Sequence, residues 1–149
     1  MQVDHHNLHG LLHSAGLVET ELRRQLAPLG IQPRQAQIID TMSRTGPISQ
    51  ADLVSARGGT SASMSTMTDR LLAAGYITRT VNPESRRQNI LSLTDKGREL
   101  LADISKAWAA VDDAIFKVLD DDAAVFFELA RKLRDGLGGE IPGAPTSPK

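Results

Sequence analysis

Leucines and other apolar residues recur at helical spacing over residues 8–29. They stand at Leu8, Leu11, Leu12, Ala15, Val18, Leu22, Leu26 and Leu29. This spacing is close to a heptad and predicts a helix with one apolar side. Such a stripe needs an apolar partner, from its own domain or from another subunit. Pro28 and Gly30 mark the end of the helix.

Two shorter helices are predicted next, between clear start and stop signals. Pro33 suits a first helical position, and Gly46-Pro47 ends that helix. Ser49 then resembles an N-cap, because Asp52 follows at capping-box spacing. Gly58-Gly59 supplies the turn after this third helix. The core faces are expected to contain Ala36, Ile38, Ile39, Met42, Leu53 and Val54.

Residues 60–74 are predicted to form a helix with two different faces. At 100° per residue, one face carries Met64, Met67, Thr68 and Leu71, which suits a core. The opposite face carries small or hydroxylated side chains and then charged ones: Ala62, Ser65, Thr66, Asp69 and Arg70, with Ser61 and Ser63 on the flanks. A solvated face would more often carry Lys, Glu and Gln, which are better helix formers.

A β-hairpin is predicted directly after this helix. Gly75 has the usual position for a helix C-terminus, and residues 76–81 have β-type composition. Asn82-Pro83 marks a turn, and residues 90–93 form the return strand, so Arg86 and Arg87 lie at or near the hairpin tip. Helix, turn, helix and hairpin are the layout of a winged helix-turn-helix. The predicted fold class is therefore mainly α with a small β-hairpin wing.

The remaining chain is predicted to be helical up to a polar tail. Thr94 caps a long helix whose expected core side contains Leu100, Leu101, Ile104, Trp108, Val111, Ile115, Val118 and Leu119. Asp120-Asp121-Asp122 interrupts it, and a last helix with Val125, Phe126, Leu129, Leu133 and Leu137 follows. Residues 138–149 are rich in Gly, Pro and small polar residues, and are expected to be disordered.

Composition narrows the function classes. The 149 residues contain no cysteine, which excludes disulfides, thiolate metal sites and cysteine nucleophiles. No phosphate-binding glycine loop, nucleophile elbow or metalloprotease motif is found, so no enzyme and no cofactor are expected. No run approaches the ~20 apolar residues of a membrane span, and the N-terminus is unlike a signal peptide. A soluble, cytoplasmic protein is expected.

The charge pattern and the helix of residues 60–74 favour binding to double-stranded DNA. Net charge is −1, yet residues 33–98 carry nine Lys/Arg against five Asp/Glu. Small hydroxyls let a helix approach phosphates and base edges closely, and guanidinium groups at a hairpin tip suit a minor groove. The predicted DNA-contacting residues are Ser49, Gln50, Ser61, Ala62, Ser63, Ser65, Thr66, Arg70, Arg79, Arg86 and Arg87.

Histidines near the N-terminus form a separate constellation. His5, His9 and His13 stand at i, i+4 and i+8, and therefore line one side of a helix. That spacing can place two imidazoles on one metal ion, although a further ligand would have to come from elsewhere. An N-terminal segment whose histidines are partly frayed or contribute to a subunit contact is the more ordinary explanation of the pattern, so no metal site is assigned.

Residues 46–100 contain the segments GPISQADL, DRLLAAGYITR, NPESRR and LSLTDKGREL in this order. This set of segments resembles the MarR (multiple-antibiotic-resistance regulator) family of bacterial transcription factors. The resemblance is detailed over residues 33–101. It implies an obligate homodimer, in which residues 1–32 and 95–137 form an all-helical dimerisation region and residues 33–94 form the DNA-binding region. Members often sense phenolic or anionic compounds in a cleft between these regions, but no residue here identifies a ligand site.

Two departures from the family pattern concern DNA recognition. The wing of the family usually carries Asp-x-Arg, and here Arg87 is present while Ser85 occupies the acidic position. An arginine is also common at the position of Thr66. Recognition is therefore expected to depend more on DNA shape and on wing arginines than on direct guanine contacts.

The sequence thus predicts a homodimeric, ligand-responsive repressor that binds a pseudo-palindromic operator. Two alternatives remain at this point. One is a winged-helix protein-interaction module without DNA activity. The other is a metal-responsive regulator that uses the N-terminal histidines.

Overall fold

The computed structural model describes residues 6–139, without the side chains of residues 86–88. Its elements are α1 (Asn7–Leu26), η1 (Ala27–Leu29), α2 (Pro33–Thr45), β1 (Ile48–Ser49), α3 (Gln50–Arg57), α4 (Ser61–Ala73), β2 (Ile77–Asn82), β3 (Ser85–Leu93), α5 (Asp95–Leu119), η2 (Asp120–Asp122) and α6 (Ala123–Gly136). The mainly helical fold class with a β wing is confirmed. The prediction for the tail largely falls on residues 140–149, which lie outside the described range.

Several helices begin and end where local chemistry dictates. Pro33 opens α2, and the Gln35 side chain accepts a 2.8 Å hydrogen bond from the Gln32 backbone N–H. Thr94 caps α5, because its hydroxyl accepts the N–H of Gly97 at 3.1 Å. The break after α5 lies at Asp120, which has a φ of 49°. These boundaries follow from neighbours in the chain, as the sequence predicts.

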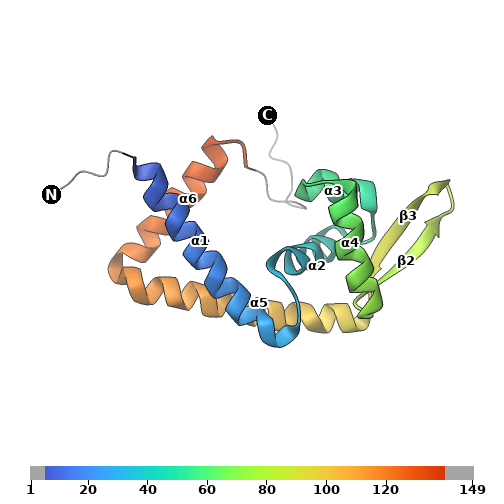
Figure 1. Cartoon of the computed structure of the whole chain (residues 1–149), viewed down its shortest axis with the longest axis horizontal. Coiled ribbons are helices and arrows are strands. Elements are labelled where there is room, and N and C mark those ends of the chain that lie inside the picture. Colours follow the sequence, from blue (N-terminus) through green and yellow to red (C-terminus); the bar gives the residue numbers. More distant parts are fainter. Residues whose placement is uncertain (1–5, 140–149) are drawn as a thin grey trace.

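α5 connects two ends of an elongated molecule (Figure 1). α1 packs along α5, and α6 leaves the far end of α5 after η2. α2, α3 and α4 gather at the other end, and the hairpin of β2 and β3 extends beyond them. The helix-turn-helix and the hairpin therefore stand at one end, away from α6. No helix among residues 6–139 is both long and apolar enough to cross a membrane.

The sheet has three antiparallel strands in the order β1-β3-β2. β3 pairs with β2 from Ile77↔Leu93 onward, and with β1 through Ile48↔Leu91 and Ser49↔Ile90. The sequence predicts the hairpin and a brief extended stretch at Ile48. It does not reveal that this stretch pairs with the hairpin. The added strand joins the base of the wing to the start of α3.

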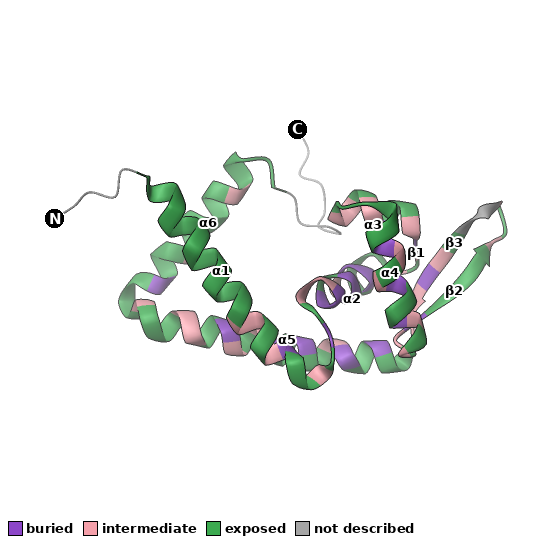
Figure 2. Ribbon diagram, viewed as in Figure 1, coloured by how far each residue is buried: buried purple, intermediate pink, exposed green. Residues whose placement is uncertain are grey.

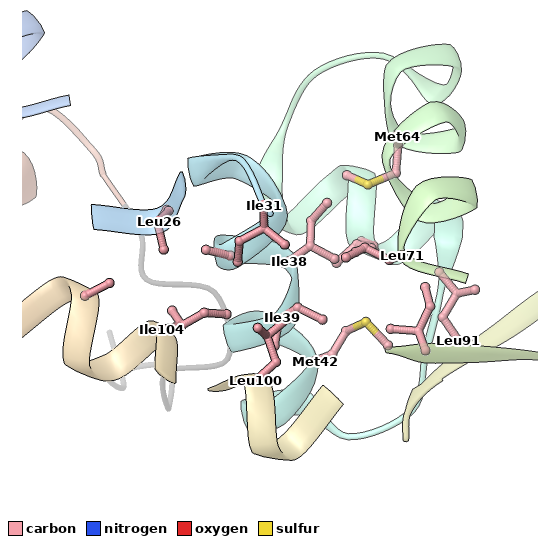
Figure 3. Packing of buried hydrophobic residues seen from close by; sticks show 14 residues of the cluster. Leu26, Ile31, Ile38, Ile39, Met42, Met64, Leu71, Leu91, Leu100 and Ile104 are labelled. Atoms are coloured by element: carbon pink, nitrogen blue, oxygen red, sulfur yellow. The ribbon is translucent and has the colours of Figure 1, made fainter. Parts of the chain in front are cut away.

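One apolar core holds α2, α3, α4, the sheet and the first half of α5 together (Figure 3). Its largest fully buried apolar side chains are Leu26, Ile38, Ile39, Met42, Leu53, Met64, Leu71, Leu91 and Ile104. α2 lies at its centre and buries Ala36, Ile38, Ile39 and Met42, as predicted. Leu26 extends this core to the end of α1.

The opposite end of the molecule is exposed along α1, along α6 and at the end of α5 (Figure 2). Apolar side chains open to solvent there are Leu8, Leu11, Leu12, Leu17, Val18, Phe116, Val118, Val125, Phe126, Leu129, Leu133 and Leu137. The prediction that Val118 belongs to the core was wrong, since its exposure is 83%. Trp108 is half-buried against the core, in keeping with a packing role.

Candidate nucleic-acid interface

The start of α4 is shaped by two glycines and a threonine cap. Gly58 and Gly59 have φ values of 74° and 88°, a region that costs glycine little and other residues more. Thr60 follows as the N-cap, and its hydroxyl accepts the N–H of Ser63 at 3.1 Å. The helix therefore opens with exposed backbone N–H groups beside small side chains. A helix N-terminus of this kind suits an anion such as a phosphate.

The outward face of α4 is as predicted. Met64, Thr68 and Leu71 are buried. The other side leaves Ser61, Ala62, Ser63, Thr66 and Arg70 exposed and Ser65 half-buried. The Thr66 hydroxyl donates to the Ala62 carbonyl at 3.2 Å, and the Ser63 hydroxyl donates to the Thr60 carbonyl at 3.1 Å. Their oxygen atoms keep lone pairs, and Arg70 contributes the long cationic side chain of this face.

Gln50 and Ser65 bind each other across the helix-turn-helix. The Gln50 side-chain amide donates to the Ser65 hydroxyl at 3.1 Å. The buried Thr68 hydroxyl lies 3.4 Å from the side-chain amide oxygen (Oε1) of Gln50, and it also donates to the Met64 backbone carbonyl at 2.9 Å. These bonds hold α3 against α4. The sequence did not reveal them, because the partners are far apart along the chain.

Ser49 has a structural role that its sequence pattern only partly indicates. Its hydroxyl accepts the N–H of Asp52 at 3.1 Å, so Ser49 is the N-cap of α3, as predicted. Its exposure is only 5%, because β1 pairs with β3 at this residue. This burial corrects our assignment of the Ser49 side chain to a DNA-facing surface. The half-buried Gln50 remains beside it at the start of α3.

An ion pair joins α4 to the wing. The Arg79 guanidinium on β2 donates to the Asp69 carboxylate on α4 at 3.2 Å. Both side chains are partly exposed, at 34% for Arg79 and 64% for Asp69. The sequence did not indicate that these two residues form a pair. The tight turn at Gly75, which has a φ of 79°, brings β2 back beside α4.

The wing turns at Pro83 and Glu84. The Asn82 side chain accepts the Glu84 backbone N–H at 3.0 Å, an Asx turn of the kind that its Asn-Pro sequence favours. Arg86 and Arg87 follow as early residues of β3, so their backbone lies close to the tip as predicted. Their side chains lie outside the described part of the structure.

The end of α4 is fastened to the beginning of α5. The Thr94 hydroxyl donates to the Gly75 carbonyl and the Lys96 ammonium donates to the Ala74 carbonyl, each at 2.6 Å. The Lys96 nitrogen also lies 4.8 Å from the ring centroid of Tyr76. Gly97 packs so closely on the Tyr76 carbonyl that a Cβ there would clash. These contacts connect the C-terminal end of α4 directly to the N-terminal end of α5.

The histidine-rich segment is only partly described. His9 and His13 lie in α1, and the rings of His6 and His9 meet edge to face at 5.7 Å between centroids. His5 lies outside the described residues. Within residues 6–139, no group of three or more His, Asp or Glu side chains is arranged to hold a metal ion.

The chain is similar in sequence and in fold to known regulators. A family model described as "MarR family" matches residues 29–88. The uncharacterized HTH-type transcriptional regulator YcgE of Bacillus subtilis (strain 168) is 22% identical over 114 residues, which cover 76% of this chain and 74% of that protein.

Solved structures share most of this fold. A MarR-family transcriptional regulator from Rhodococcus sp. RHA1 has a TM-score of 0.77 at 21% identity, with 91% of this chain and 95% of that chain covered. A mutant of MarR from E. coli, crystallised with operator DNA, has a TM-score of 0.73 at 22% identity, with 85% and 93% covered. The family match over residues 29–88, which spans most of the winged helix, and the fold shared with these solved structures agree with the resemblance read from the sequence.

Proposed function

We propose that this protein is a homodimeric transcriptional regulator that binds a pseudo-palindromic operator in double-stranded DNA. The observation that carries the proposal is the outward face of α4. It presents small and hydroxylated side chains beside a helix N-terminus, and an arginine-bearing hairpin follows it. Such a face can lie close to base edges in a major groove while the hairpin reaches the adjacent backbone or minor groove.

The proposed contacts divide between helix and wing. Ser61, Ala62, Ser63, Ser65, Thr66 and Arg70 would face the major groove, with Gln50 at its edge. Arg79, Arg86 and Arg87 would contact phosphates or the minor groove. Because Arg70 is the long cation on the helix and the other side chains are short, we expect a substantial contribution from DNA shape.

Dimerisation is supported by the uncovered apolar side chains of α1 and α6. Monomeric proteins seldom expose large contiguous apolar surfaces. These helices lie at the end of the molecule away from the wing (Figure 2). A second copy that covers them would leave both winged helices free. Two half-sites about one helical turn apart, on the order of 10 bp, would then face the two α4 helices.

We further propose that the regulator is a repressor that an effector releases from DNA. The related protein crystallised with operator DNA supports binding to an operator. A phenolic or anionic compound that favours a dimer with wrongly spaced α4 helices would lower DNA affinity by population shift. The junction of α4 with α5 supplies a physical connection between dimer geometry and the position of α4.

DNase footprinting of the DNA around its own gene tests the proposal. Protection of a pseudo-palindrome at submicromolar protein, weakened by salt, is expected. Arg86→Ala/Arg87→Ala should weaken that binding, with circular dichroism showing an intact fold. Absence of any salt-sensitive, sequence-preferring binding would refute it and favour a protein-interaction module. Transcription from the footprinted promoter, with and without a panel of phenolic carboxylates, then tests repression and release.

A further inference from the structure

Three arginines lie near one another around the end of α3 and the turn between α3 and α4, and none of them is among the proposed DNA contacts. Arg34 stands in the first turn of α2, Arg44 in its last turn, and Arg57 at the end of α3. Together with Asp40, we refer to these residues as the arginine cluster. Arg34 lies across the glycine turn: its guanidinium donates to the Gly58 carbonyl at 2.7 Å.

The cluster carries more positive charge than its own carboxylate can balance. Asp40 is the acidic residue that acts on Arg57, and it is already bonded to Arg44 at 2.9 Å. Among the side chains that the structure describes, Arg57 has no hydrogen-bond or ion-pair partner, and its Nε is buried. Partial burial, and to a smaller extent the charges of Arg34 and Arg44, lower the pKa of Arg57, while Asp40 raises it.

An arginine in this situation is poorly explained by folding alone. Its guanidinium has given up part of its hydration, it lies close to two like charges, and a buried N–H remains unpaired. A planar guanidinium pairs best with a planar or tetrahedral oxyanion, because two parallel N–H groups match two oxygen atoms. An apolar side chain in place of Arg57 would have packed against the core equally well, without the cost of partly burying a charge.

We propose that the arginine cluster is an anion site, in which Arg57 and Arg34 bind an oxyanion of the phosphate or carboxylate class. The anion would supply the acceptor that Arg57 lacks and would offset the net positive charge of the cluster. Arg34 would then hold both the anion and the Gly58 carbonyl. Two sources fit this chemistry: a phosphate of the DNA backbone and a free small anion.

The position of the site gives it a consequence for α4. The residue after Gly58 and Gly59 is Thr60, the N-cap of α4. An anion that ties α2 to this turn restricts the start of the helix that presents the outward face. The effect of the anion on α4 as a DNA-contacting helix rests on the proposed function, whereas anion binding itself does not require DNA.

Thermal unfolding of the DNA-free, full-length protein tests the site directly. Sodium phosphate is titrated against sodium chloride at matched ionic strength, and isothermal calorimetry with phosphate and with benzoate gives the affinity. We expect phosphate or benzoate to raise Tm beyond the chloride effect in the wild-type protein. Arg57→Gln should remove most of that rise, and Arg34→Gln should reduce it.

Lys106→Gln is the matched control, because it removes one charge from an exposed position on α5. It should keep the full anion effect. If Arg57→Gln does not fold, Arg57→Lys retains the charge without the planar fork and should show a reduced rise. Equal Tm shifts in chloride and in both anions, or an undiminished shift in the arginine variants, would overturn the anion site.

Salt-dependent DNA binding distinguishes the two sources. If a backbone phosphate occupies the site, Arg57→Gln should lower the slope of log K against log[salt] by about 1. If a free anion occupies it, the slope stays unchanged and phosphate modulates DNA affinity only in the wild-type protein. An anion-dependent Tm rise in a protein that binds no DNA would retain the site and reject the proposed function.

Discussion

The two ends of this molecule differ in how they use apolar residues. At the winged-helix end, α2, α3, α4 and the sheet close around one core in which Ile38, Leu71 and Leu91 are at most 1% exposed. At the other end, Leu129 and Leu133 of α6 are 57% and 48% exposed. The same amphipathic pattern therefore completes a core in one region and leaves a surface in the other. The winged helix buries its apolar residues within the chain, whereas the proposed dimer requires a partner to cover α1 and α6.

The largest expected effect comes from charging the uncovered surface. Leu129→Asp/Leu133→Asp should convert a dimer to monomers, because burial of each leucine is worth about 1.5–3 kcal/mol. Each leucine is already about half buried in a single chain, so replacing the four leucines of a dimer should together weaken association by roughly 100- to 10,000-fold. Analytical ultracentrifugation measures the change. Lys132→Glu places a negative charge on the same exposed helix and serves as the control. A wild-type protein that sediments as a monomer at micromolar concentration would contradict the partner requirement.

Shortening a core side chain at the winged-helix end should lower the stability of the fold and leave dimer association unchanged. Leu71→Ala removes a side chain that is 1% exposed on the inner face of α4. The lost contacts and the remaining cavity should lower the free energy of unfolding by about 2–5 kcal/mol. Urea denaturation followed by circular dichroism measures it. Unchanged stability in this variant would mean that α4 is not anchored through its apolar face.

The stability of the junction between α4 and α5 should be sensitive to a single added methyl group. A Cβ at Gly97 would clash with the Tyr76 carbonyl, so Gly97→Ala should destabilise the protein by about 1–3 kcal/mol. Gly16→Ala in α1 meets no atom within 4 Å and should stabilise α1 by about 0.5–1 kcal/mol. Thermal unfolding of both variants gives the comparison. A loss of stability in Gly16→Ala would indicate that the partner packs closely at that position.

The smallest expected effect on stability concerns the ion pair between α4 and the wing. Asp69→Asn weakens an exposed bond, and exposed pairs contribute about 0–1 kcal/mol. The effect on DNA should be larger, because Arg79 loses its anchor and α4 loses a negative charge. We expect tighter but less selective DNA binding, measured by competition between operator and unrelated DNA. Unchanged selectivity would show that the pair does not orient the wing.

Local chemistry in the sequence determined where the elements begin and end. Pro33, Thr60 and Thr94 start helices, and Gly58-Gly59 and Gly75 end them, because each effect depends on residues a few positions away. The two faces of α4 also follow from the 3.6-residue period. These features were sufficient for the fold class and for the outward face of the proposed interface.

Contacts between distant residues were decided only by the tertiary structure. β1 pairs with β3 and buries Ser49, Gln50 binds Ser65, and Arg79 binds Asp69. Helical periodicity marked the apolar sides of α1 and α6 without indicating what covers them. The physical reason is the same in each case. Periodicity and capping act within a few residues, whereas burial and side-chain pairing depend on which surfaces the whole chain brings together.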